Sequence, residues 1–184
     1  GNGIGLKHGW RILKISWKYK MIEHRKIRST TILGVRSKGK VAVAGDGQVT
    51  LGDMAMKQKA VKVRKFDSQK GGVVGGFAGA AADALTLFEK FEQKLDEYEG
   101  DLKRSVVEMA KDWRTDKILR HLEALLLVMD KRDSFIIAGD GNVIEPDGAI
   151  VSIGSGGGFA QSAATAFLQS GKYSARQIAE KSLK

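Results

Sequence analysis

The sequence predicts an α+β domain in which two β-sheets pack against each other and helices cover their outer faces. The chain has 184 residues, of which 42% are hydrophobic, and this is enough for one compact core. Its local patterns follow the order strands, two helices, strands, two helices, which is typical of packed sheets with outer helices. Residues 44–49 also resemble residues 138–143, which indicates two similar halves, although an Asp-Gly turn after an apolar strand would produce the same pattern.

Short strands are predicted at the start of the folded body, which begins at Thr30. Their residues are apolar or alternate, and turns containing glycine separate them: 31–35, 40–44, 60–66 and 73–77. In the third of these segments the period of two places Lys62 and Arg64 on one face, and Val61 and Val63 on the other.

Two helices are predicted next, because apolar residues recur at helical spacing. The first covers about residues 80–98 and the second about residues 101–129, with Gly100 between them. The apolar stripe of the first helix consists of Ala84, Leu87, Phe88, Phe91 and Leu95. The last part of the chain repeats the order, with strands at 134–138, 143–144 and 149–153 and helices at 159–169 and 175–183. Ser174 is expected to cap the final helix.

The composition excludes several classes of function. The chain contains no cysteine, which excludes a disulfide scaffold, a thiol nucleophile and any cysteine-based zinc site. The net charge is +10, but residues 1–29 carry +7 of it and residues 30–184 only +3. A nucleic-acid-binding domain should carry a basic face on its folded body, so nucleic acid is not an expected partner. No apolar run approaches the roughly 20 residues that span a bilayer, so no membrane is expected either.

Residues 1–29 form a basic leader that is expected to be removed or disordered. The leader lacks the continuous apolar stretch of a secretory signal. Its basic residues, with apolar residues between Trp10 and Trp17, loosely resemble an organelle transit peptide, which would indicate a mitochondrial location. Alternatively, translation starts at Met21 and the residues before it are upstream sequence, in which case a bacterial cytoplasmic location is expected.

The common catalytic and cofactor-binding patterns are missing from the sequence. The histidines are His8, His24 and His121, and they do not support a Ser-His-Asp triad. There is no HExxH spacing for a metal and no GxxxxGK[ST] loop for ATP. The glycine run at 154–158 is followed by Phe159, where a dinucleotide-binding loop needs glycine or alanine.

The threonine pair Thr30-Thr31 at the start of the folded body is the remaining candidate for chemistry. An N-terminal threonine can attack through its hydroxyl while its own α-amine accepts the proton. An α-amine titrates near about 7.7–8.0, so a useful share of it is neutral at physiological pH. A threonine inside a chain has no such base, so this chemistry requires the removal of residues 1–29.

Many short stretches of residues 30–184 match one known family, and they do so in order. They are residues 30–32, 44–48, 50–52, 56–57, 62–65, 77–79, 82–84, 86–89, 110–116, 122–124, 153–157, 174–176 and 178–181. The string Lys-Asp-Trp-Arg-Thr-Asp at 111–116 is the most family-specific of them. By these residues the chain resembles the HslV branch of the proteasome-like N-terminal-nucleophile hydrolases. The resemblance implies a four-layer αββα sandwich and a threonine endopeptidase that degrades unfolded protein.

The same resemblance implies a set of site residues. Thr30 matches the nucleophile, and Lys62 matches a lysine whose ammonium lowers the pKa of the threonine α-amine. Asp46 matches the acid that pairs with that lysine and keeps it charged. The backbone N–H of Gly79 matches the oxyanion donor, and Ser155 matches a serine that forms hydrogen bonds around the amine.

The resemblance also implies partners. Two stacked six-membered rings of this chain would enclose the sites, and an HslU-type AAA+ ATPase would deliver unfolded polypeptides to them. That partner would use ATP, whereas this chain would need no cofactor of its own. The family also has a structural sodium site, whose region lies beyond Lys184, so no metal-binding residue is named here.

Two departures from the family pattern leave an alternative open. The family continues with further strands after the position of Lys184, so the peptidase domain at 30–184 is expected to be C-terminally shortened. Ser29 precedes Thr30, whereas relatives that process themselves favour glycine there, because the backbone must contort at that bond. A catalytically silent ring subunit of the same fold is therefore the alternative to an active endopeptidase.

Overall fold

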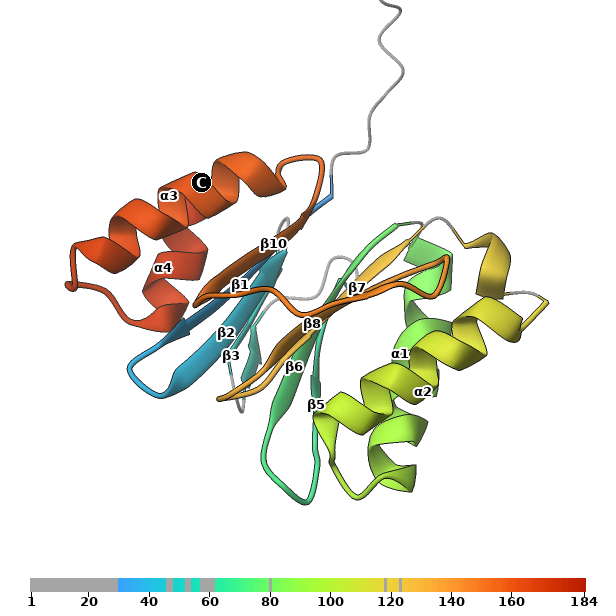
Figure 1. Ribbon diagram of the computed structural model, residues 1–184. Coiled ribbons are helices and arrows are strands. Elements are labelled where there is room, and N and C mark those ends of the chain that lie inside the picture. The colour runs from blue at the N-terminus through green and yellow to red at the C-terminus, as the bar shows by residue number, and fades with distance from the viewer. Residues whose placement is uncertain are drawn as a thin grey trace, which may run out of the picture.

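The computed structural model describes residues 30–45, 48–51, 54–56, 62–79, 81–117, 119–122 and 124–184. These residues form the predicted four-layer αββα sandwich (Figure 1). Two sheets face each other across one apolar cluster, and a pair of helices packs on the outer face of each sheet through a further cluster.

The first sheet is antiparallel, with the strand order β10-β1-β2-β3-β4. Its strands are β1 (Thr31–Ser37), β2 (Lys40–Gly45), β3 (Gln48–Leu51), β4 (Met54–Met56) and β10 (Ile150–Gly154). Strand β1 lies between β2 and β10, where Thr31 pairs with Gly154. The short strands β3 and β4 were not predicted, because segments of this length carry too few residues for a periodic pattern.

The second sheet is also antiparallel, with the strand order β5-β6-β7-β8-β9. Its strands are β5 (Val63–Phe66), β6 (Val73–Ala78), β7 (Leu125–Met129), β8 (Ser134–Ala138) and β9 (Val143–Ile144). Lys62 directly precedes β5. On that strand Val63 is buried between the sheets and Phe66 is buried against the helices, so the strand faces apolar material on both sides.

The sheets approach each other closely because glycine occurs where they touch. Ile32 and Val43 of the first sheet are buried against the second sheet. A Cβ atom on Gly76 of β6 would overlap the Ile32 side chain and would lie 3.1 Å from Cγ1 of Val43. The Val-Val-Gly-Gly-Phe strand is therefore glycine-rich for a packing reason, and any larger residue at Gly76 would push the sheets apart.

The helices pack in pairs. Helices α1 (Ala81–Glu97) and α2 (Leu102–Thr115) cover the second sheet, α3 (Gly157–Gln169) and α4 (Ala175–Ser182) cover the first, and a 3-10 helix η1 (Leu119–His121) follows α2. The predicted apolar stripe of α1 is confirmed, because all five of its residues are buried. The predicted cap of α4 is also confirmed: Ser174 and Gln177 form a reciprocal capping box.

The predicted helix over residues 101–129 is wrong in its second half. Helix α2 ends at Thr115, and the apolar run at 125–129 forms strand β7. A continuous apolar run fits a buried helix or a buried strand equally well, so periodicity could not decide. The run is a strand because β7 lies between β6 and β8 and is covered on both faces, with Leu126 against the helices and Leu127 against the other sheet.

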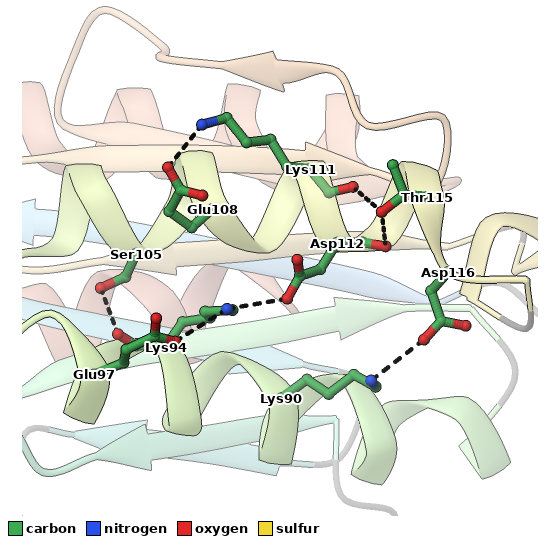
Figure 2. A network of polar contacts seen from close by, with 9 residues as sticks. All are labelled: Lys90, Lys94, Glu97, Ser105, Glu108, Lys111, Asp112, Thr115 and Asp116. Carbon is green, nitrogen blue, oxygen red and sulfur yellow. Dashed lines mark hydrogen bonds and ion pairs between the residues drawn. The ribbon is translucent and has the colours of Figure 1, made fainter.

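Ion pairs tie the last turns of α2 to α1 (Figure 2). Nζ of Lys94 lies 3.0 Å from Glu97 on its own helix and 3.0 Å from Asp112 on α2. Lys90 pairs with Asp116, the C-cap of α2, at 3.4 Å. The hydrogen bond from Lys94 to Glu97 raises the pKa of Lys94 most, and the one to Asp112 raises it further. Burial of the ammonium has the opposite, smaller effect on this pKa. The same lysine lowers the pKa of Glu97.

Candidate active site

The two sheets share a cavity of about 870 Å³ at one end of the sandwich. Its lining comes from the start of β1, the ends of β6, β8 and β10, the start of β7 and the 3-10 helix η1. Thr30, Gly79 and Ser155 all line this cavity, although they are far apart in the sequence. The structure therefore brings together three of the five residues that the resemblance singled out.

Thr30 is held in place by the neighbouring strand β10. It is half-buried and directly precedes Thr31, which pairs with Gly154. Gly154 has a φ of +89°, a conformation that favours glycine. A Cβ atom there would lie 2.8 Å from the carbonyl carbon of Thr30 and would overlap its oxygen. The absence of a side chain at Gly154 is thus what allows the backbone of Thr30 to lie so close to β10.

Gly79 and Ser155 follow the last residues of β6 and β10, and both are exposed to the cavity. A Cβ atom on Gly79 would lie 2.8 Å from the ring of Phe77 and 2.9 Å from Cβ of Ala124. A side chain at this position would therefore have to displace a buried ring or the start of β7. This tight fit explains why glycine occupies this position in the cavity wall.

The structure does not place Lys62 and Asp46 in the lining of the cavity. Lys62 is half-buried just before β5, and its carbonyl oxygen accepts a hydrogen bond of 2.8 Å from the Phe77 N–H. Lys62 is near the end of β2, since a Cβ atom added to Gly45 would lie 3.5 Å from Cβ of Lys62. Lys62 is not among the described residues that line the cavity. Asp46 lies outside the described residues, so its pairing with Lys62 stays a prediction.

Polar residues that the sequence analysis did not assign to the site also line the cavity. Arg120 and His121 come from η1, and Asp140 comes from the turn after β8. His121 was expected inside a long helix, and Arg120 had no expected role. No local pattern pointed to them, because the apolar run at 125–129 fits a buried helix as well as a buried strand and does not show that a sheet edge precedes it.

The described part of the chain places no group of three or more His, Asp or Glu side chains where they could hold a metal ion. Within the same residues, none of the helices has the length and apolar character needed to cross a membrane.

The comparisons with known proteins agree with this geometry. The family model described as proteasome subunit matches residues 27–184. The chain belongs to the proteasome family. Within that family it is 55% identical over 159 residues to the ATP-dependent protease subunit HslV of Treponema denticola, a match that covers 86% of this chain and 88% of the relative.

Solved structures are similar to this chain as well. The crystal structure of HslV from Trypanosoma brucei matches with a TM-score of 0.69 and 47% identity, over 83% of this chain and 87% of that one. A second structure, BPH of Thiobacillus denitrificans, has a TM-score of 0.57 over 81% of this chain and 85% of its own, and at 21% identity it supports the fold alone. The sandwich is therefore of the N-terminal-nucleophile hydrolase type found in proteasome subunits, as the sequence predicted.

Proposed function

We propose that this chain is the threonine endopeptidase subunit of an ATP-dependent, proteasome-like protease of the HslV type, and that it becomes active when Thr30 is the first residue. One observation supports this function above all. Thr30, Gly79 and Ser155 line a single cavity in a chain that is 55% identical to an ATP-dependent protease subunit. A cavity of about 870 Å³ is large enough to hold a short segment of a peptide.

The reaction uses groups of the chain itself. The Thr30 hydroxyl attacks the carbonyl carbon of the scissile peptide bond, and its proton passes to the α-amine of the same residue. The negative charge that develops on the carbonyl oxygen is stabilised by the N–H of Gly79. The tetrahedral intermediate expels the amine of the leaving peptide, which takes the proton, and an ester to Thr30 remains. Water then hydrolyses the ester and restores the hydroxyl.

Lys62, Asp46 and Ser155 support that reaction in the proposal. The ammonium of Lys62 favours the neutral form of the Thr30 α-amine, because two nearby positive charges repel each other. Asp46 keeps Lys62 charged, and Ser155 orients the amine by a hydrogen bond. No cofactor is assigned to this chain, and no residue of it is assigned to the family's sodium ion.

The proposal includes an assembly and a location. Copies of the chain form two stacked six-membered rings that enclose the cavities, and an HslU-type ATPase unfolds substrates and uses the ATP. Enclosure is needed because a peptidase with little sequence preference must be kept away from folded proteins. Neither nucleic acid nor a membrane is part of the assembly, and the bacterial relative favours the cytoplasm as its location.

Mass spectrometry of the purified protein, combined with a peptidase assay, tests the proposal. We expect a mature chain that starts at Thr30, hydrolysis of a short fluorogenic peptide, and complete loss of that hydrolysis in the variant Thr30→Ala, with the same particle size on gel filtration. A protein that keeps residues 1–29 in every copy, or a Thr30→Ala variant that still cleaves the peptide, would refute the mechanism. The first of these outcomes would support a catalytically silent ring subunit instead.

A further inference from the structure

The family-specific string at 111–116 holds a short turn in place rather than lining the cavity. The side chain of Trp113 is fully buried, and its Nε1–H donates a 2.9 Å hydrogen bond to the carbonyl oxygen of Leu119. Oδ1 of Asp116 accepts from the Leu119 N–H at 3.0 Å, and its carbonyl oxygen accepts from the Arg120 N–H at 3.1 Å. Three hydrogen bonds to Trp113 and Asp116 therefore hold the start of η1 against the end of α2.

The other side of the turn is fixed as well. A Cβ atom on Gly139 would overlap the carbonyl oxygen of Leu122, so the backbone of the turn lies directly against the end of β8. Asp116 is itself paired with Lys90 of α1 (Figure 2). Buried hydrogen bonds of this kind are costly to break, so the residues that η1 presents have a defined position.

The turn presents Arg120 to the cavity that contains Thr30. Arg120 is exposed there, and its guanidinium forms no ion pair with any described residue. Among the described residues that line the cavity, the acidic one is Asp140, whose oxygens accept hydrogen bonds from the backbone and the side chain of Asn142. Asp140 therefore forms hydrogen bonds within its own turn, whereas no described residue accepts a hydrogen bond from the guanidinium of Arg120, whose five N–H donors can bind another molecule.

We infer that Arg120 is a specificity-determining residue that binds a carboxylate of the peptide substrate near the bond to be cut. This inference rests on the proposed function and adds a substrate preference to it. A guanidinium matches a carboxylate with two parallel hydrogen bonds, and such bonds are among the stronger polar contacts. The carboxylate belongs either to an Asp or Glu side chain or to the free C-terminus of the peptide.

Quenched fluorescent peptides of one sequence test the inference. They differ at one position, which is Glu or Gln, and each is made with a C-terminal acid or a C-terminal amide. Hydrolysis is measured as kcat/KM on the full, processed protein, and binding is measured by fluorescence on the Thr30→Ala variant, which cannot cleave. The substitution is Arg120→Gln. Lys117→Gln is the matched control, because it removes the same charge from an exposed residue just before η1 that does not line the cavity.

We expect peptides with a carboxylate to be preferred by about threefold to tenfold, the range of one charge-assisted contact that is partly exposed to solvent. Arg120→Gln abolishes that preference and Lys117→Gln retains it. Loss of a preference for Glu assigns the contact to a side chain, and loss of a preference for the C-terminal acid assigns it to the terminus.

Two other outcomes separate the inference from the proposed function. If the protein cleaves none of the peptides but Thr30→Ala prefers the carboxylate in an Arg120-dependent way, the peptidase function fails and the binding inference stands. If binding and cleavage do not depend on the carboxylate, or if Arg120→Gln and Lys117→Gln change them equally, the inference is overturned.

Discussion

The variant Gly154→Ala tests the close fit between β10 and Thr30. Gly154 has a φ of +89°, and an L-residue in the left-handed region costs about 1–2 kcal/mol. The added methyl group would also lie 2.8 Å from the carbonyl carbon of Thr30 and 3.6 Å from Cβ of Ala78. The Thr30 carbonyl must therefore retreat by roughly 1 Å, and a displacement of that size can reduce catalysis about 100-fold. We expect a large loss of kcat/KM with a smaller loss of stability.

Gly158→Ala is the matched control for this variant. Gly158 lies four positions further along the chain, in α3, and a Cβ atom there would meet nothing within 4 Å. Alanine is the better helix former by up to about 1 kcal/mol, so this variant should be neutral or slightly more stable. The assays are peptide hydrolysis and thermal unfolding of both proteins. If Gly154→Ala cleaves peptide as fast as Gly158→Ala does, the position of Thr30 does not depend on β10 and the reasoning is wrong.

Other residues give further tests. Lys62→Ala should remove most peptidase activity. Its pH–rate profile should shift to higher pH, because the Thr30 α-amine regains a higher pKa when the nearby ammonium is gone, and an unchanged profile would contradict the proposed effect of Lys62 on that amine. Lys94 lowers the pKa of Glu97, so the Glu97 carboxylate contributes its full stability above the ordinary glutamate pKa and loses it as the pH falls through the lower pKa of the folded state. Glu97→Gln should therefore be less stable than wild type at neutral pH, and the difference in free energy of unfolding should shrink in denaturant titrations at increasingly acid pH. Ser174→Ala should lower the free energy of unfolding by about 1 kcal/mol in a denaturant titration, because α4 loses its capping box, and it should leave peptide hydrolysis unchanged.

Much of the fold could be predicted from the sequence because local patterns agree with tertiary burial. The stripe at Ala84, Leu87, Phe88, Phe91 and Leu95 follows helical spacing, and every one of these residues is buried against the second sheet. The pattern failed at 125–129, where a strand covered on both faces carries no alternation. It also failed for β3 and β4, because strands this short are defined by their partners rather than by their own residues.

The site could be predicted only in part, and for a different reason. Thr30, Gly79 and Ser155 were named by resemblance, and they share a cavity. Sequence spacing alone could not have predicted that they lie together, because Thr30 and Ser155 adjoin the first sheet whereas Gly79 follows a strand of the second. Arg120 was missed because its position depends on a buried indole and a carboxylate at the end of α2, and no sequence period records such contacts.

The residues that line the cavity are synthesised at different times, because they run from Thr30 to Ser155 in the sequence. Thr30 leads the folded body, but β10 and Ser155, which complete the wall beside it, emerge long after β1 has been synthesised. The pairing of Thr31 with Gly154 is a contact between distant parts of the sequence, and such contacts form late in folding. A partly synthesised chain thus contains Thr30 without the strand that holds it in place. In the proposed enzyme, the cavity beside Thr30 is therefore complete only after most of the chain has been synthesised.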